Sequence, residues 1–484
     1  MPLELIDTKS GDLLDRAKQI EAFEADSIFN ELVSSMTTEI DLPRIRREVK
    51  KFYRYVMLSH RWQLVEPRYK DVKNNKVSEL KTSSTNKLKA FCKLVCSLGF
   101  QWAWCDTCCV DQDNTVVLQE SLVAMFTWYR GSILTIVYLQ DVPSKSFSDS
   151  DWNKRAWTYQ EYVAAETVQF YTVDWKPYLR SDLWNHKKSP EIVSEMQRMS
   201  QVTADQLAVL CPGRDRVREK LFLASKRLST RVEDIAYSLL GIFGVSIPVI
   251  YGEGTRAVGR FLEHILKASG DLTILAWTGT ANEYNSCLPL NLTVYDSLEP
   301  PHIPYMETAR LDEEVSKSDP SIPDLAVLAE ALKGFSSPSH SASMDSGRLR
   351  LPCISSLIGE LVLMSGPDAE TNLCIYRATT TVFGKIEIKT TSELAVEREH
   401  FVVHPWIPSL LGQEYLRRSV GLDEIKKALR LLVRLRQPFG ALLLEKVSWV
   451  DHKRVAADSL ILVQVPEEVP LLDLVKNIEM IFVQ

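Results

Sequence analysis

The sequence predicts an α/β protein: a parallel sheet covered by helices on both faces, then a helical extension and a mostly β C-terminal domain. Three observations predict this fold. Short apolar runs each end in polar residues, segments with helical spacing separate these runs, and alternating segments dominate after a stretch rich in Pro and Ser. The 484 residues are too many for one hydrophobic core, so two or three domains are expected.

Composition and charge exclude some classes of partner. The net charge of -6 argues against nucleic acid, because nonspecific binding to phosphates needs an excess of Lys and Arg. The acidic start is unlike a secretory signal, and no stretch approaches 18 uninterrupted apolar residues, so we expect no membrane span. Nine scattered cysteines are typical of reduced thiols. Together these features predict a cytoplasmic protein.

Residues 1–52 are predicted to form an N-terminal strand and a helical segment. The start is apolar, and apolar residues recur at helical spacing from about Asp12 to Met36. A run of five basic residues follows, and a solvated face is expected there, with phosphate binding as the alternative. The run consists of Arg44, Arg46, Arg47, Lys50 and Lys51.

Residues 53–175 carry the alternation that defines the parallel sheet. Buried strands are predicted at 55–59, 100–105, 133–139 and 167–171, with helices at about 86–98, around 118–129 and at 157–165. In such sheets ligands bind beyond the carboxyl ends of the strands. The polar residues that follow the strands, Ser59 to Trp62 and Asp106 to Asp111, are therefore expected to converge on one edge.

The rest of the chain is divided by composition. Residues 176–278 are predicted to be a helical extension, 279–347 a linker, and 348–484 a β-rich domain. Within the extension, a capping box at Thr230–Glu233 is expected to open a helix, and Leu272 to Trp277 to form a strand. The C-terminal domain is predicted to contain strands at 348–356, 373–380, 384–390 and 400–407, a helix at 414–436, and strands around Leu442 and Leu460.

Cysteine chemistry offers two further hypotheses. Cys92, Cys96, Cys105 and Cys108 together contain the ligand type that zinc prefers, but their spacing departs from the usual pairs of CxxC knuckles, and we predict no metal site. A cysteine nucleophile with His60 as its base is the other hypothesis, for which no orienting third group is identified.

Trp157 and Glu161 are four residues apart and share one face of a predicted helix. A carboxylate beside an indole suits the binding of a ribose and its base. The same segment also fits an ordinary amphipathic turn with a solvated Glu. Position behind the third strand favours the functional reading.

Three segments in this order resemble the fungal heterokaryon-incompatibility (HET) domain. They are Tyr55–Trp62, Trp104–Asp111 and Trp157–Glu161, and the likeness continues through Arg231–Phe243 and Tyr251–Gly254. It covers about Leu3 to Trp277. The family implies a trigger of cell death in fungal non-self recognition, and a distant kinship with Toll/interleukin-receptor (TIR) domains, hence a TIR-like, flavodoxin-like sheet at 53–175.

The same resemblance implies a site. Some TIR domains cleave NAD, and their catalytic Glu follows a Trp on a helix behind the third strand, as Glu161 follows Trp157 here. Glu161 would be catalytic. The residues that would bind the substrate NAD are Ser59, His60, Arg61 and Trp62 (phosphate and base), Asp106 and Asp111 (ribose or loop orientation) and Trp157 (stacking).

This sequence also departs from the family pattern. Tyr159 and Tyr162 replace a Leu common in HET sequences, and Arg61 stands where Thr is usual. No cofactor is implied, and NAD would be a substrate. The competing hypothesis is a non-enzymatic adaptor that acts by self-association or through a protein trigger, with Glu161 in an interface or helix-capping role.

Overall fold

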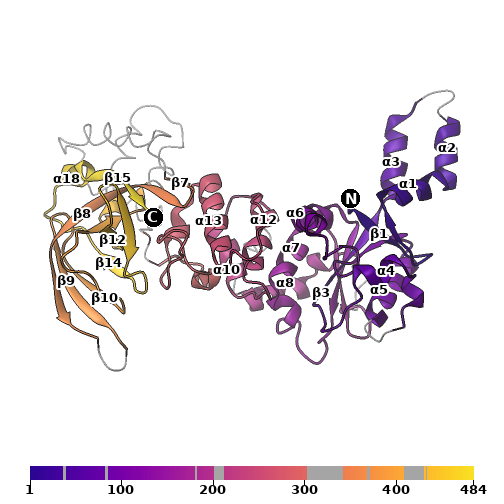
Figure 1. Cartoon of the computed structure of the whole chain (residues 1–484), viewed down its shortest axis with the longest axis horizontal. Helices are drawn as coiled ribbons and strands as arrows, with labels where there is room; N and C mark the ends of the chain where they lie inside the picture. The colour runs from indigo at the N-terminus through magenta and orange to yellow at the C-terminus, as the bar shows by residue number, and fades with distance from the viewer. Residues whose placement is uncertain are drawn as a thin grey trace. The chain divides into compact units, whose positions relative to one another are not determined.

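The computed structural model forms two compact units (Figure 1). The first comprises Met1–Gly213 and Arg227–Val249, and the second comprises Arg214–Lys226 and Ile250–Gln484. The structure describes residues 1–35, 40–81, 85–179, 183–200, 212–301, 303, 342–367, 371–407, 430–431 and 433–484.

The first unit is built on a six-stranded sheet with the order β2-β1-β4-β3-β5-β6. β4, β3, β5 and β6 run parallel, which confirms the predicted parallel sheet, whereas β1 and β2 are antiparallel additions at one edge. The strands are β1 (Glu4–Asp7), β2 (Leu13–Asp15), β3 (Tyr55–His60), β4 (Trp102–Trp104), β5 (Leu134–Leu139) and β6 (Val168–Thr172).

Helices connect the parallel strands as the sequence predicts. α5 (Asn86–Ser97) joins β3 to β4, α6 (Thr115–Gly131) joins β4 to β5, and α7 (Ala156–Ala164) joins β5 to β6. The Asn114 side chain begins α6 by accepting hydrogen bonds from two backbone N–H groups of its first turn. This connectivity brings the carboxyl ends of β3, β4 and β5 to one edge of the sheet.

Three helices lie between β2 and β3 in the sequence, and the last of them carries the basic run (Figure 1). They are α1 (Arg16–Glu24), α2 (Ser27–Ser35) and α3 (Leu42–Phe52). In α3 the residues Arg46, Arg47, Lys50 and Lys51 are exposed, and Arg44 is half-buried, which confirms a solvated face. Short helices follow at α4 (Tyr69–Lys73), η1 (Val77–Glu79), η3 (Asp151–Lys154) and η4 (His186–Lys188).

The core of the first unit is continuous around β3 and β5, all of whose residues are buried. A close approach of two helices adds to it. Gly241 of α12 (Leu240–Phe243) faces the Phe126 ring of α6 so closely that a Cβ at this position would overlap the ring. Glycine is therefore required here by packing rather than by its backbone angles.

Two predictions in the helical extension are wrong. Leu272 to Trp277 is not a strand but contains the 3₁₀ helix η5 (Leu272–Leu275). Thr230–Glu233 opens no single long helix: two short helices follow, α11 (Asp234–Tyr237) and α12, and Val232 is exposed. Apolar residues at helical spacing also fit two short helices separated by a turn. The remaining helices are α8 (Pro190–Ser200), α10 (Val217–Ser225) and α13 (Arg256–Ser269).

The second unit is rich in β structure, as predicted. β8 pairs with β11 and β15 through its first half and with β9 through its second half. Pairings β11–β12, β12–β13 and β13–β15 close a ring with β8. The strands are β7 (Ser343–Asp345), β8 (Arg348–Ser365), β9 (Cys374–Thr380), β10 (Gly384–Thr390), β11 (His400–His404), β12 (Phe439–Lys446), β13 (Asp451–Val455), β14 (Ile461–Val463) and β15 (Ile478–Val483).

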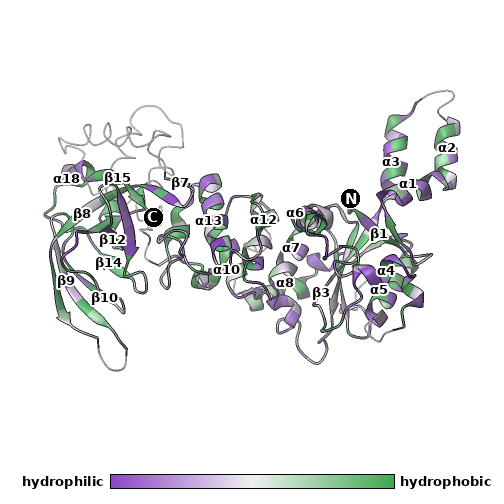
Figure 2. Ribbon diagram, viewed as in Figure 1, coloured by the Kyte–Doolittle hydropathy of each residue, from purple (hydrophilic) through white to green (hydrophobic). Residues whose placement is uncertain are grey.

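Helical elements complete the second unit. α13 carries both hydrophobic and hydrophilic residues (Figure 2), and its apolar residues Val258, Phe261, Leu262, Ile265 and Leu266 are buried. The other helical elements of this unit are α10, η5, η6 (Leu292–Tyr295) and α18 (Leu471–Lys476). None of the helices within the described ranges combines the length and apolarity that a membrane span requires.

Part of the segment predicted as a linker is packed into the second unit. Cys287, Leu288, Leu292 and Tyr295 are all buried, because these apolar side chains are interspersed among the Pro and polar residues that suggested a linker. Residues 304–341, which include the most Ser-rich stretch, lie outside the described residues. So does most of the predicted helix at 414–436, of which residues 430–431 and 433–435 are helical.

Candidate functional site

The carboxyl edge of the sheet gathers polar side chains from three elements. Ser59 and His60 end β3, Cys105 and Asp106 follow β4, and Glu161 lies on α7. Two linked clusters of hydrogen bonds result. Ser59 belongs to one cluster and His60 to the other, because successive residues of a strand point to opposite faces of the sheet.

Ser59 and Glu161 form the first cluster with a Trp. The Ser59 hydroxyl donates a hydrogen bond to the Glu161 carboxylate, and it accepts one from the Trp152 indole N–H at 2.8 Å. All three side chains are buried, with Glu161 only 3% exposed. Glu161 is therefore not the solvated carboxylate that the segment alone also allowed.

Burial sets the protonation of Glu161. Burial, together with the negative charge of Asp106, raises the pKa of Glu161 from its ordinary value of 4.5 to about 7. The hydrogen bond from Ser59 and the charges of Arg155 and His60 act in the opposite direction. A carboxyl with this pKa changes its charge near neutral pH.

His60 is the centre of the second cluster. Its Nε2 lies 3.0 Å from Asp106 Oδ1, and its Nδ1 lies 2.7 Å from the Lys87 ammonium nitrogen. Lys87 also donates to the Glu66 carboxylate, and Trp62 donates its indole N–H to Asp106 Oδ2 at 2.7 Å. Although burial opposes it, hydrogen bonding and the charge of His60 lower the pKa of Asp106.

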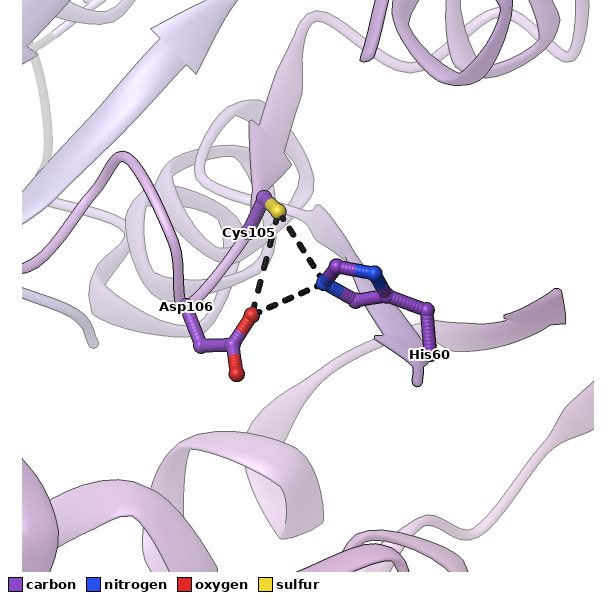
Figure 3. Close-up of side chains that lie close together, drawn as sticks. All are labelled: His60, Cys105 and Asp106. Atoms are coloured by element: carbon purple, nitrogen blue, oxygen red, sulfur yellow. Dashed lines mark hydrogen bonds and ion pairs between the residues drawn. The ribbon is translucent and has the colours of Figure 1, made fainter. Parts of the chain in front are cut away.

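Cys105 also contacts the His60 ring (Figure 3). Its Sγ is 3.6 Å from His60 Nε2 and 3.9 Å from Asp106 Oδ1. Although burial and Lys87 act to lower it, the pKa of His60 is raised to about 9 by Cys105 and Asp106. Burial raises the pKa of Cys105, but Cys108 and His60 outweigh burial and lower it.

The contact with Lys87 distinguishes the two protonation forms of the Cys105–His60 pair. The charged form is a thiolate beside an imidazolium, and an imidazolium would direct its Nδ1–H at the Lys87 ammonium only 2.7 Å away. In the neutral form Nδ1 accepts from Lys87, and the ring proton on Nε2 is donated to Asp106. Cys105 and Asp106 thus favour the imidazolium, whereas the Lys87 contact favours the neutral imidazole.

Not all of the predicted site residues join these clusters. Arg61 forms an exposed ion pair with Asp151. The Asp111 carboxylate accepts a hydrogen bond from the backbone of Asp113 at 3.2 Å, which shapes its own loop. Trp157 is half-buried on α7, and Trp152, not Trp157, is the indole that hydrogen bonds beside Glu161.

The cluster of Ser59, Trp152 and Glu161 is closed to solvent, whereas the His60 cluster reaches the surface at Trp62 and Asp106. Ser59 is fully buried, and the side chains of Glu66 and Lys87 are 7% and 6% exposed. A groove does exist on this unit, between α6 and residues 246–249, and it is lined by none of the predicted site residues. Entry of a nucleotide would therefore require movement of the loops that cover Glu161.

Comparison with known families bears directly on these residues. Residues 55–148 match the family model described as "Heterokaryon incompatibility protein (HET)". The chain contains a HET domain. The matched range of the HET domain includes Ser59, His60, Cys105 and Asp106, and it ends before Trp152 and Glu161.

One curated relative extends the likeness of the HET domain. The chain is 35% identical over 243 residues to "Vegetative incompatibility protein HET-E-1" of Podospora anserina. The alignment covers 46% of this chain and 17% of that relative, so the chain spans a small part of its length. No solved structure matches the chain.

Three residues of the two clusters, Trp152, Lys87 and Glu66, were not predicted from the sequence. They lie between predicted elements or on the predicted helix at 86–98, where nothing in their local pattern distinguishes them. Trp152 follows four polar residues in a segment with no apolar periodicity. A buried Lys beside a buried Glu is visible only once the fold has brought α5 and the loop after β3 together.

Proposed function

We propose that this chain acts in vegetative incompatibility and that its HET domain cleaves NAD at the nicotinamide–ribose bond. The proposal is supported by the match to the HET family, by the relative named for vegetative incompatibility, and by the buried carboxylate of Glu161. The single observation that carries the chemistry is the Ser59–Glu161 hydrogen bond at the carboxyl edge of a parallel sheet.

The proposed reaction is hydrolysis: NAD and water give nicotinamide, ADP-ribose and a proton. Nicotinamide leaves as a neutral group, so no strong general acid is required, and the ribose develops the positive charge of an oxocarbenium ion. An ionised Glu161 beside the ribose would stabilise that charge. In a buried site this attraction is stronger than in water.

Ser59 and Trp152 have a positioning role in this proposal. The hydroxyl of Ser59 holds one carboxylate oxygen of Glu161, and the Trp152 indole N–H holds that hydroxyl. His60 and Asp106 lie on the other side of the strand end and bond to each other. Because the pKa of Glu161 is about 7, the reaction is expected to accelerate as the pH rises through 7.

Closure of the site gives the proposal a second requirement. Glu161 is covered in the isolated chain, so an assembly or a protein trigger would have to shift the loops that follow β3 and precede α7. Two contacts link these loops: the Arg61–Asp151 ion pair, and the Arg155 guanidinium 5.7 Å from the centre of the Trp62 ring. We expect activity to increase with protein concentration if assembly opens the site.

Purified full-length chain, incubated with NAD over a range of protein concentrations, provides the test. Release of nicotinamide is followed by chromatography. We expect Glu161→Gln to lower the rate by about 10²- to 10³-fold, the usual effect of losing one electrostatic contact to a transition state. Glu120→Gln, at an exposed position of α6, is the matched control. Absence of release from the wild type, or release that Glu161→Gln leaves unchanged, would overturn the enzymatic proposal.

One observation favours the adaptor function as a second candidate. The loop after β3 exposes Leu64 completely and Val65 to 64%, next to the half-exposed Trp62. Such a cluster suits self-association. If expression arrests growth equally for wild type and Glu161→Gln while cellular NAD stays constant, and Leu64→Asp abolishes the arrest, the adaptor function is favoured over catalysis.

A further inference from the structure

His60, Cys105 and Asp106 direct three different ligand atoms toward one point (Figure 3). The distances are 3.0 Å between His60 Nε2 and Asp106 Oδ1, 3.6 Å between His60 Nε2 and Cys105 Sγ, and 3.9 Å between the sulfur and that oxygen. Within the described ranges, these residues form a group whose ligand atoms all lie within 4.8 Å of one another. We propose that they bind a zinc ion.

The three distances fit the edges of a zinc tetrahedron. Zinc binds Cys sulfur at about 2.3 Å, and His nitrogen and carboxylate oxygen at about 2.0–2.2 Å. Tetrahedral angles at those lengths place the ligand atoms about 3.4–3.6 Å apart. The 3.6 Å between His60 Nε2 and Cys105 Sγ matches this value, and the other two separations, 3.0 Å and 3.9 Å, need a shift of about 0.4 Å. Thiolate and imidazole favour zinc over calcium or magnesium, which prefer oxygen. Three protein ligands leave a fourth position for water.

Neighbouring residues prepare two of the ligands for a metal. The Trp62 indole N–H donates a hydrogen bond to Asp106 Oδ2. The other carboxylate oxygen, Oδ1, points toward His60 and Cys105. The Thr107 hydroxyl lies 3.1 Å from Cys105 Sγ and can donate to a thiolate. Such contacts orient ligands and raise metal affinity in characterised sites. Cys105 is buried, and the Asp106 side chain is 15% exposed, which leaves the carboxylate as the side open to water.

A catalytic Cys-His-Asp triad is excluded by the same geometry. In a triad the nucleophile and the orienting carboxylate contact opposite nitrogens of the imidazole. Here Cys105 and Asp106 both face Nε2, and Lys87 occupies the Nδ1 side. Convergence of sulfur and oxygen on one nitrogen is the arrangement that a shared metal ion requires. Cys92, on the apolar face of α5, takes no part.

Zinc binding requires one proton to leave and the His60 tautomer to change. The pair of Cys105 and His60 holds two protons in the free protein and would hold one in the complex, on Nδ1 of a neutral ring. Lys87 must then turn away from Nδ1. It already donates to Glu66, whose carboxylate lies 3.9 Å from Nδ1 and can accept the new Nδ1–H after a small shift. The charges of a thiolate, a carboxylate and Zn²⁺ sum to zero.

Cobalt substitution tests the site on the full chain without NAD, so its result is independent of the proposed NAD cleavage. Tetrahedral Co²⁺ bound to a thiolate gives a sulfur-to-cobalt charge-transfer band in the near ultraviolet and intense visible d–d bands. We expect one equivalent of Co²⁺ to produce both in metal-free wild type, and one equivalent of Zn²⁺ to remove them.

Variants assign the ligands. Cys105→Ser is expected to lose the charge-transfer band, whereas Cys96→Ser, at an exposed position of α5, retains it. Trp62→Phe removes the N–H that holds Asp106 and keeps an aromatic ring beside Arg155, and it is expected to weaken binding about 10- to 100-fold. The absence of a charge-transfer band in the wild type, or its persistence in Cys105→Ser, overturns the proposal.

X-ray absorption at the zinc edge of the wild type gives an answer even if Cys105→Ser does not fold. The proposal requires one sulfur and two or three nitrogen or oxygen neighbours. Zero sulfur neighbours or more than one sulfur neighbour contradicts the site, the latter because Cys108 or Cys109 would then hold the metal in place of His60 and Asp106.

Discussion

Replacing Glu161 by Gln should stabilise the fold at alkaline pH. Glutamine keeps an oxygen that accepts the hydrogen bond from Ser59, and it removes the need to bury a negative charge. In the folded chain the pKa of Glu161 is raised to about 7, mainly by burial, whereas an unfolded chain would have the ordinary value of 4.5. Ionisation therefore costs free energy only in the folded state.

The sign and size of the effect follow from this difference. A carboxyl with a raised pKa in the folded state costs nothing below pH 4.5, and stability is lost as the pH rises from 4.5 to 7. A tenfold change in proton affinity corresponds to about 1.4 kcal/mol. Wild type should therefore be less stable than Glu161→Gln by roughly 1 kcal/mol at pH 5 and roughly 3 kcal/mol at pH 8.

Hydrogen exchange is the suitable assay, because a chain of two compact units need not unfold in one step. The slowest amides of β3 and β5 report the unfolding free energy of the unit that contains Glu161. Glu120→Gln, at the exposed site on α6, should show no pH-dependent difference from wild type. If Glu161→Gln is no more stable than wild type at pH 8, the carboxylate is not held in a buried, charge-disfavouring site.

Two further predictions concern packing and hydrogen bonding. Ser59→Ala should destabilise the first unit by about 1–3 kcal/mol, because the buried Trp152 indole N–H loses its acceptor. The same substitution should raise the pKa of Glu161 further, which carbon NMR of labelled Glu can measure. The control Ser97→Ala, on the exposed face of α5, should change neither the stability nor the pKa of Glu161. Gly241→Ala should cost about 1–3 kcal/mol, because its Cβ would overlap the Phe126 ring, whereas Gly366→Ala, with no atom within 4 Å of its Cβ, should leave stability unchanged in thermal unfolding.

The sequence predicted the sheet well because parallel, buried strands are short and uniformly apolar. β3 and β5 are buried throughout, and the polar residues after β3 and β4 do converge as expected. The strand predicted at Leu272–Trp277 is absent, because its sequence pattern is ambiguous. An apolar run of this length is equally compatible with a buried 3₁₀ turn, and only tertiary packing distinguishes the two.

The grouping of these side chains, not their function, was predicted in part. Ser59, His60, Trp62, Asp106 and Glu161 are joined by hydrogen bonds or lie in linked clusters, whereas Arg61, Asp111 and Trp157 have other contacts. Spacing on a helix placed Trp157 near Glu161 but could not reveal Trp152, which reaches Ser59 from the loop before α7. The catalytic and binding roles of all these residues stay predictions.

The adjacency of Ser59 and His60 at the end of β3 has a consequence for how this protein can change. The two residues serve different clusters because the strand alternates between its faces. Loss of one residue from β3 would turn the imidazole to the face of Glu161 and the hydroxyl to the opposite face, so both residues would lose their present partners at once. Substitutions can therefore alter either cluster alone, but insertions and deletions within this strand must alter both.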